Sequence, residues 1–213
     1  VDVVDKLLPL QPSKAIRTQH QPAMDWRILP AFYQQHLANA ERFDVSRALL
    51  SFVILTGCRS GEARSMRWEE LDLDAAIWTI PADRMKTQVI HRIPLSLQAM
   101  AVLEKVQGLH GEWVFPSPRK QVPLTDMALT TLLRRVEAPS TTPERLATAH
   151  GFRSTFRDWC SEQGYPRDLA ERALAHLIQN KVEAAYHRTD LLDQRRPMMD
   201  AWAEFVTDNL PTE

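Results

Sequence analysis

Hydrophobic residues recur at helical spacing over most of the chain from residue 24 onward. The first such stretch has Asp25 as its candidate N-cap and returns an apolar side chain every three or four positions, at Trp26, Leu29, Phe32, Tyr33 and Leu37. The next stretch, residues 44–56, is apolar on most faces and predicts a helix buried among others. Gly57 ends it, and a further helix with Ser60 as its N-cap is expected to run to about Trp68.

The pattern changes in the middle of the chain. Two runs rich in β-branched residues, 76–80 and 89–95, predict an antiparallel hairpin with a long connection. The helical period then returns over residues 96–107, 125–137, 150–163, 167–174, 181–188 and about 191–210. We therefore expect a mainly α fold with a small antiparallel β-sheet, of the α+β class.

Composition excludes several classes of protein. A chain of 213 residues with 44% hydrophobic residues is long and apolar enough to fold around a core without disulfides. No stretch approaches the roughly 18 apolar residues of a membrane span, and no secretory signal is visible. The two cysteines, Cys58 and Cys160, stand alone, which excludes a disulfide scaffold and fits a reducing compartment. We expect a cytoplasmic protein that does not associate with membranes.

The net charge of -1 is a sum of unlike regions. Between residues 84 and 135, the basic residues Arg84, Lys86, Arg92, Lys105, Arg119, Lys120, Arg134 and Arg135 face only Glu104, Glu112 and Asp126. After Arg196 the charged residues are all acidic. One face can therefore be basic and bind a polyanion although the whole chain is neutral.

Two clusters of basic residues lie at predicted helix starts, where free N–H groups and the positive dipole end attract anions. Arg59 directly precedes the helix capped by Ser60. In the second cluster Thr148 is the candidate N-cap, and one helix face carries His150, Arg153 and Arg157 while the opposite face is aromatic. Each cluster also has an ordinary explanation. Arg59 could sit in a surface turn paired with Glu62 or Glu70, and the second face could simply be solvated.

Three further residues have side chains suited to proton transfer or nucleophilic attack. Lys86 lies in the connection of the hairpin, and His176 lies ten residues before Tyr186 on a predicted short helix. A hairpin lysine is usually solvated and a helical tyrosine usually belongs to a core. Taken with the arginines, however, these side chains suit attack on a phosphodiester without a metal ion, because cations would stabilise both the phosphate charge and a phenolate. Neither an HExxH zinc motif nor a GxxxxGK[ST] phosphate loop is present.

The same residues carry a family resemblance. The segments 56–68 (TGCRSGEARSMRW), 71–96, 149–159 (AHGFRSTFRDW) and 171–188 (ERALAHLIQNKVEAAYHR) resemble, in this order, the boxes of the tyrosine recombinases, the phage integrase family. The likeness covers residues 24–210 and is nearest to integrases of P4-like prophages and genomic islands. It implies the catalytic-domain fold of DNA breaking-rejoining enzymes.

The resemblance also implies a role for each residue. Arg59 and Arg153 would be the two catalytic arginines, Glu62 would brace the first, and Lys86 would be the general acid. His150 would transfer a proton, His176 would hydrogen-bond the scissile phosphate, and Tyr186 would be the nucleophile. Candidate phosphate contacts, chosen only because they are basic and lie in the right segments, are Arg134, Arg135 and Arg157. Ala175 stands where the family often has Gly, a change that should keep function.

The implied activity is site-specific DNA recombination through a 3′-phosphotyrosyl intermediate, with no cofactor or metal, to integrate or excise a prophage or genomic island. The implied partners are double-stranded attachment sites, a homotetramer on DNA formed from monomers, and accessory directionality and DNA-bending proteins. We expect residues 1–23 to be a linker from N-terminal DNA-binding domains and residues 24–213 to form the catalytic domain.

Three other interpretations remain open. A type IB topoisomerase-like enzyme would share nearly the same active-site residues, although a long last helix favours a recombinase. A catalytically inactive remnant could bind DNA without cutting it. The clusters could also be coincidental in a helical protein unrelated to DNA.

Overall fold

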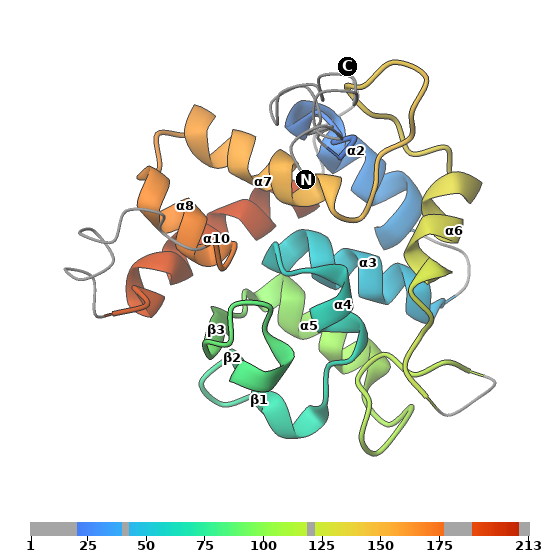
Figure 1. Ribbon diagram of the computed structural model, residues 1–213. Coiled ribbons are helices and arrows are strands. Elements are labelled where there is room, and N and C mark those ends of the chain that lie inside the picture. Colours follow the sequence, from blue (N-terminus) through green and yellow to red (C-terminus); the bar gives the residue numbers. More distant parts are fainter. Residues whose placement is uncertain (1–20, 40–42, 119–121, 177–188, 209–213) are drawn as a thin grey trace, which may run out of the picture.

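The computed structural model describes residues 21–39, 43–118, 122–176 and 189–208 (Figure 1). The described helices are α2 (Leu29–Tyr33), α3 (Val45–Thr56), α4 (Ser60–Arg64), α5 (Leu97–Val106), α6 (Met127–Arg135), α7 (Gly151–Glu162), α8 (Arg167–Ala173) and α10 (Leu192–Thr207). The strands are β1 (Leu71–Asp72), β2 (Ile77–Ile80) and β3 (His91–Pro94). The expected class, mainly helical with one small antiparallel sheet, is confirmed.

Helix α3 is the centre of the core. It packs against α4, α5, α6, α7 and α10, and its side chains are buried over most of its length, as its apolar sequence predicts (Figure 1). The Asp44 carboxylate caps it by accepting a hydrogen bond from the N–H of Ser46 (2.8 Å). Gly57 ends it in the left-handed conformation at φ 63°. The carbonyls at this C-terminus lie in the middle of the molecule.

The sheet lies on one side of this core. Its order is β1-β2-β3, and all pairs are antiparallel, with Trp78 opposite Ile93. Trp78 and Ile80 of β2 are fully buried and hold the sheet against the core. Strand β1 was not expected, and β2 and β3 are shorter than the predicted runs. The connection between them contains a 3-10 turn, Ala82–Arg84, in place of ladder hydrogen bonds.

Helix α4 is the main correction to the sequence prediction. It ends at Arg64, not near Trp68, and its N-cap is Arg59, not Ser60. The chain leaves the helix because the carbonyl of Met66 accepts a hydrogen bond from the N–H of Val114 (3.1 Å), so this stretch pairs with a distant loop. Trp68 opens a separate 3-10 turn.

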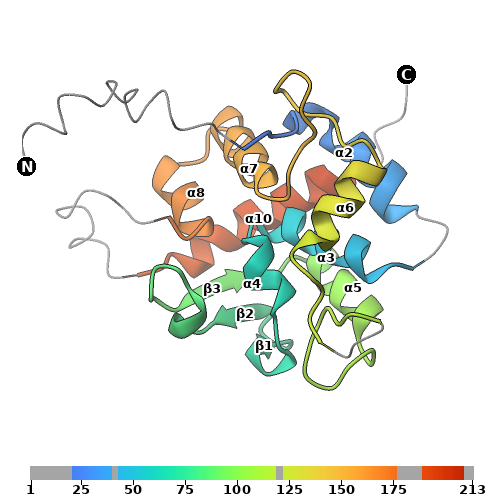
Figure 2. The same ribbon diagram turned by 45° about the vertical axis from the view of Figure 1, so that its right-hand side comes forward.

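Helices α7 and α10 meet through aromatic rings. Trp159 of α7 lies 5.1 Å from Trp202 of α10 between ring centroids. Helix α10 also packs against α2, α3, α5, α8 and β3, and Figure 2 shows it running behind α7 and α8. It covers most of the predicted 191–210 helix, whose last residues lie outside the described part. The predicted 181–188 helix also falls outside it, as do residues 1–20 of the expected linker.

The described end of that expected linker packs on the fold. The Pro22 carbonyl accepts a hydrogen bond from the N–H of Thr148 (3.1 Å), and the Ala23 carbonyl accepts one from Thr141 (2.8 Å). No helix in the described ranges has the length and apolar run needed to cross a membrane.

Candidate active site

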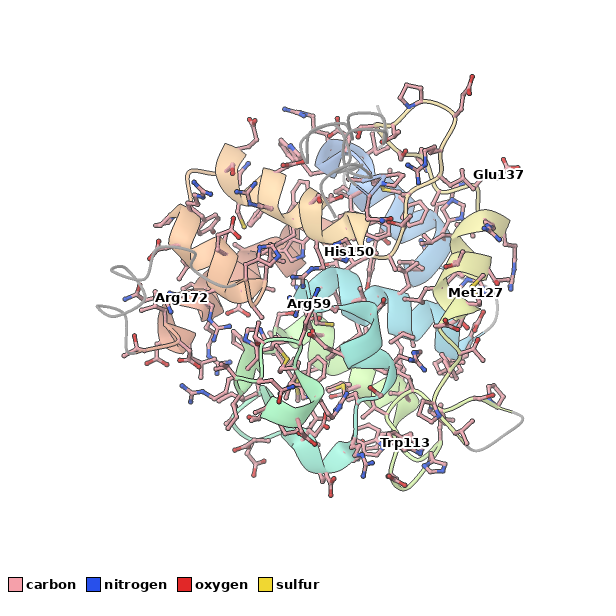
Figure 3. The ribbon with its side chains drawn as sticks, in the orientation of Figure 1. Arg59, Trp113, Met127, Glu137, His150 and Arg172 are labelled. Atoms are coloured by element: carbon pink, nitrogen blue, oxygen red, sulfur yellow. The ribbon has the colours of Figure 1, made fainter. Side chains whose placement is uncertain are left out.

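Arg59 stands at the start of α4, near the middle of the molecule (Figure 3). Its guanidinium donates to the carboxylate of Glu62 (2.7 Å), and its backbone N–H donates to the other oxygen of the same carboxylate (2.9 Å). Glu62 is buried and therefore fixes both the side chain and the backbone of Arg59. The remaining terminal nitrogen donates to the carbonyl of Ala175 (3.3 Å), beyond the end of α8.

Arg153 is buried between two helix ends. One terminal nitrogen donates to the carbonyl of Gly57, after α3 (2.5 Å), and the other donates to the carbonyl of Leu174, after α8. Its sequence pattern placed it on a basic face, but the structure leaves it only 4% exposed. A buried cation needs compensation, and the negative dipole ends of two helices supply it here. No carboxylate among the described residues bonds to Arg153.

The charge of Arg153 survives this burial. Burial and the positive charge of Arg59 lower the pKa of Arg153 to about 10. The guanidinium is therefore still protonated at neutral pH. Because carbonyls hold it and do not neutralise it, the site keeps a net positive charge that can stabilise an anion. Arg59 and Arg153 lie close to each other, because they donate to the consecutive carbonyls of Ala175 and Leu174.

The turn after α8 gives both arginines their carbonyl partners. The N–H of His176 donates to the carbonyl of Glu171 (2.9 Å), and the N–H of Ala175 donates to that of Arg172 (3.0 Å), which is the Schellman pattern of helix ends. Ala175 occupies the left-handed position at φ 49°. Glycine is the usual residue there because a Cβ is unfavourable at positive φ. The alanine noted in the sequence is therefore strained, and it belongs to the candidate site.

His176 joins Arg153 to a carboxylate. Its Nε2 lies 3.1 Å from a terminal nitrogen of Arg153, and its Nδ1 is hydrogen-bonded to Glu171. Because an arginine only donates, these partners place the proton of a neutral His176 on Nδ1. The other oxygen of Glu171 accepts from Nε of Arg157 (2.6 Å). Arg157, a candidate phosphate contact, is therefore also part of this chain of hydrogen bonds.

His150 stands at the N-cap position of α7, beside Arg59 (Figure 3). The helix begins one residue later than predicted, and its N-cap is His150, not Thr148, although the hydroxyl of Thr148 still accepts a hydrogen bond from the N–H of Gly151 (3.0 Å). Partial burial, together with the positive charges of Arg153 and Arg59, lowers the pKa of His150. Its exposed imidazole is thus neutral at pH 7 and can accept a proton.

Lys86 sits apart from this cluster, on an exposed turn of the hairpin connection. The N–H of Gln88 closes the turn by donating to the carbonyl of Met85 (3.0 Å). Met85 and its neighbours face His176 across a cavity of about 160 Å³. The structure thus brings the Lys86 turn to the edge of the arginine cluster.

Three predicted residues remain to be placed. Tyr186 lies outside the described residues, so its role stays a prediction. Arg134 and Arg135 are exposed on the last turn of α6, and none of the described contacts relates them to the arginine cluster. Across the described ranges, no group of three or more His, Cys, Asp or Glu side chains is placed to hold a metal ion.

Some residues near the arginine cluster were not predicted from the sequence. Asp190 forms a two-pronged ion pair with Arg92 of β3 (both 2.8 Å), 98 residues away in the chain, and its backbone carbonyl accepts from buried Arg195 (2.8 Å). Glu171 was also missed. Its spacing of five residues from His176 was the only local signal, while no local pattern could pair Arg92 with Asp190.

Comparison with known proteins shows that the sequence matches a protein family. The model of the phage integrase family matches residues 32–191. Prophage integrase IntA of Escherichia coli K12 is 40% identical over 164 residues, 76% of this chain and 38% of IntA. The integrase of Enterobacteria phage P4 is 32% identical over 91% of this chain and 47% of its own length. The chain therefore spans about half or less of these relatives.

Solved structures agree on the fold. The integrase of mycobacterium phage Brujita superposes with a TM-score of 0.63 at 20% identity, covering 99% of this chain and 64% of that one. A lambda integrase tetramer bound to a Holliday junction gives a TM-score of 0.57 at 19% identity, over 77% of this chain and 49% of that one. The helices and sheet described above therefore have the fold that these integrase structures share.

Proposed function

This chain belongs to the phage integrase family, and from that premise we propose that it cuts and rejoins DNA at specific sites as the catalytic part of a site-specific recombinase. The observation that carries the proposal is the meeting of Arg59 and Arg153 on one turn of chain. Their guanidinium groups bond to the consecutive carbonyls of Leu174 and Ala175, and His176 follows on the same turn.

The arginines stabilise the charge that develops on a phosphodiester. When a nucleophile attacks phosphorus, negative charge grows on the non-bridging oxygens, and donors fixed in advance stabilise it most. Arg153 is fixed by two helix ends and Arg59 by Glu62. For His176 to hydrogen-bond the same phosphate, as the family resemblance implies, its Nε2 must gain a proton and turn from Arg153 to a phosphate oxygen, because that oxygen only accepts.

Proton transfer accompanies the bond changes. The Tyr186 oxygen forms a bond to phosphorus while the bond from phosphorus to the 5′ oxygen breaks. Neutral His150 accepts the phenolic proton, and Lys86 donates a proton to the leaving 5′ oxygen. A 5′ hydroxyl of a partner strand then attacks the 3′-phosphotyrosyl link in the reverse sense. The covalent link conserves the bond energy, so the proposed steps need neither ATP nor a metal ion.

The proposed partners are double-stranded attachment sites of a prophage or genomic island, in the cytoplasm. Two sites and four protomers would form the active assembly, with monomers in the absence of DNA, and accessory directionality and DNA-bending proteins would bias integration or excision. The arginines of the protein are proposed to contact DNA phosphates. Such contacts position the protein on the duplex but do not read its base sequence. Arg134, Arg135 and Arg157 are proposed to supply such contacts.

A covalent-adduct experiment tests this function. The chain is incubated at low salt with a pool of nicked duplexes whose core is randomised, so that cleavage beside the nick releases a short strand and traps the adduct. Denaturing gels and sequencing of the trapped DNA should reveal a 3′-linked adduct with a preferred core, which Tyr186→Phe does not form. An adduct level equal in the two proteins would contradict the nucleophile, and an adduct in neither would contradict the function.

A second assay separates strand exchange from relaxation. Once a core is known, supercoiled plasmids carrying one or two copies of it are compared. We expect recombinant products from the two-site plasmid. Relaxation of both plasmids without recombinants would instead favour the topoisomerase-like activity.

A further inference from the structure

Arg84 is the hub of a hydrogen-bonded network beneath the hairpin connection. One terminal nitrogen donates to the carboxylate of Glu70, and the other donates to the carbonyl of Glu62 (2.7 Å) and the hydroxyl of Ser65 (2.9 Å). The indole N–H of Trp78 donates to the second oxygen of Glu70 (2.9 Å). One arginine therefore ties the connection to α4, to the turn after it and to β2.

The network is buried. The Glu70 side chain is 6% exposed, that of Arg84 is 18% exposed, and Trp78 is fully buried. Buried charged hydrogen bonds hold a fixed geometry, and removing one partner leaves the others unsatisfied. The position of Arg84 is thus set by the core, although it lies in a segment without strand or α-helix.

Two predicted active-site residues are attached to this network from opposite sides. Glu62, whose carbonyl accepts from Arg84, uses its carboxylate to hold Arg59. On the other side, only buried Met85 separates Arg84 from Lys86, and the carbonyl of Met85 closes the Lys86 turn. The side chain of Lys86 is itself exposed. The nearest residues in the chain that are held by contacts with the core are therefore Arg84 and Met85.

We propose that Arg84 is a positioning residue for proton donation to the leaving group, because it fixes the Lys86 turn on the helix that holds Arg59. This inference rests on the proposed function and deepens it. Without Arg84 the two arginines keep their own supports, namely Glu62, Gly57 and the turn after α8. The loss of Arg84 therefore affects the approach of Lys86 to the 5′ oxygen and leaves stabilisation of the phosphate charge in place.

A change of leaving group tests this. Two nicked substrates of the same sequence carry either the normal 5′ bridging oxygen or a 5′ bridging sulfur at the scissile bond. A thiol is a much stronger acid than an alcohol, so a thiolate departs without a proton donor. Single-turnover rates of adduct formation are measured for wild type, Arg84→Met, Arg84→Lys and Ser65→Ala.

A matched control is Arg64, at the end of α4. It donates to the carbonyl of Leu124 (3.0 Å), far in sequence from the hairpin connection, so Arg64→Met, like Arg84→Met, removes a partly buried arginine. It should slow both substrates equally, if at all.

We expect Arg84→Met to slow cleavage of the oxygen substrate by about tenfold or more and to leave the sulfur substrate within about threefold of wild type. Arg84→Lys and Ser65→Ala, which keep part of the network, should show the same selectivity with a smaller loss. Equal slowing of both substrates, or no slowing, would overturn the proposal.

The set of variants still tests the proposal if Arg84→Met does not fold. If Arg84→Met melts below the assay temperature, Ser65→Ala decides the question, since it removes only one neutral hydroxyl, which accepts from Arg84 and donates to the carbonyl of Gly61 (2.9 Å). Wild-type protein that forms no adduct on either substrate would refute the proposed function itself, and the positioning role with it. Wild-type cleavage without leaving-group selectivity in the variants refutes only the role of Arg84.

Discussion

The surroundings of Arg153 and of Lys86 hold two predicted catalytic cations in opposite ways. Arg153 lies among helix ends, is 4% exposed, and bonds to carbonyls of two separate segments. Lys86 lies on an exposed turn whose own hydrogen bonds are local. The difference matches the two tasks, because charge stabilisation requires donors fixed before the reaction, while proton donation requires a group that can reach the departing oxygen.

The comparison also shows what holds each region in place. Around Arg153, the helix-end carbonyls compensate a buried charge and leave it positive. Around Lys86, the compensation is in the supporting layer, where Arg84 and Glu70 form a buried pair. Substitutions in the first region should therefore affect both stability and chemistry, and those at Lys86 should affect chemistry alone.

The largest effect is expected from Arg153→Met. It removes a fixed donor from the phosphate and leaves the carbonyls of Gly57 and Leu174 unpaired, so cleavage should fall by about 10³-fold and stability by about 1–3 kcal/mol. Single-turnover cleavage and thermal melting measure the two losses. Arg153→Lys keeps the charge without the two-pronged geometry and should also be nearly inactive. Cleavage by Arg153→Met within tenfold of wild type would contradict the role of Arg153 in stabilising the charge of the phosphate.

Lys86→Ala should give a smaller loss of activity and none of stability. Removing a general acid costs about 10²-fold or more in cleavage, whereas truncating an exposed lysine leaves the melting temperature unchanged. Lys105→Ala, at another exposed basic position on α5, is the control and should be silent in both assays. A large drop in melting temperature for Lys86→Ala would show that the turn is structural.

Glu171→Gln should weaken cleavage by about tenfold, because it loosens the hold on His176 without touching the phosphate. Burial opposes ionisation of Glu171, but hydrogen bonds from His176 and Arg157 hold the pKa of this carboxyl below its ordinary value. A lowered pKa stabilises the fold above the ordinary carboxyl range and ceases to do so as the pH falls through the folded pKa.

The same variant therefore has a signature in melting curves. Wild type should be more stable than Glu171→Gln at neutral pH, and the gap should close in acid, below about pH 4. A gap that stays constant from neutral to acidic pH would show that the ion pairs of Glu171 contribute nothing.

Two backbone substitutions give the smallest effects, with opposite signs. Ala175→Gly relieves a left-handed alanine and should stabilise the protein by about 1 kcal/mol, raising the melting temperature by about 2–4 °C. Gly57→Ala places a Cβ at φ 63° and should destabilise it by a similar amount, although the space around Gly57 would admit the methyl group. Melting curves that shift in the same direction would contradict the strain at both helix ends.

The positions of helices could be predicted from the sequence more accurately than the contacts between distant segments. Apolar periodicity and caps located α3, α5 and α7 within one or two residues, because local hydrogen bonds and one buried face determine such helices. The sequence prediction missed β1 and the early end of α4, since both depend on distant partners. The burial of Arg153 also escaped it, because helical spacing placed this residue on a polar face while the carbonyls that compensate it come from remote segments.

In the candidate site, too, some residues could be predicted from the sequence and others could not. The order and spacing of the boxes brought Arg59, Arg153 and His176 together as candidates, and the structure has them in contact with one turn. The supporting residues Arg84, Glu171 and Asp190 have no motif of their own, since their roles come from the shape of the folded chain.

The central claim is that Arg153 stabilises the charge on the phosphate while Lys86 donates a proton to the leaving group. The most direct test is the ratio of cleavage rates on the oxygen and sulfur leaving groups, measured side by side for Arg153→Met and Lys86→Ala. We expect sulfur to restore Lys86→Ala to within about tenfold of wild type and to leave Arg153→Met impaired, because a better leaving group replaces a proton donor and not a charge-stabilising one. Rescue of both variants, or of neither, would contradict the assignment of the two regions to different steps.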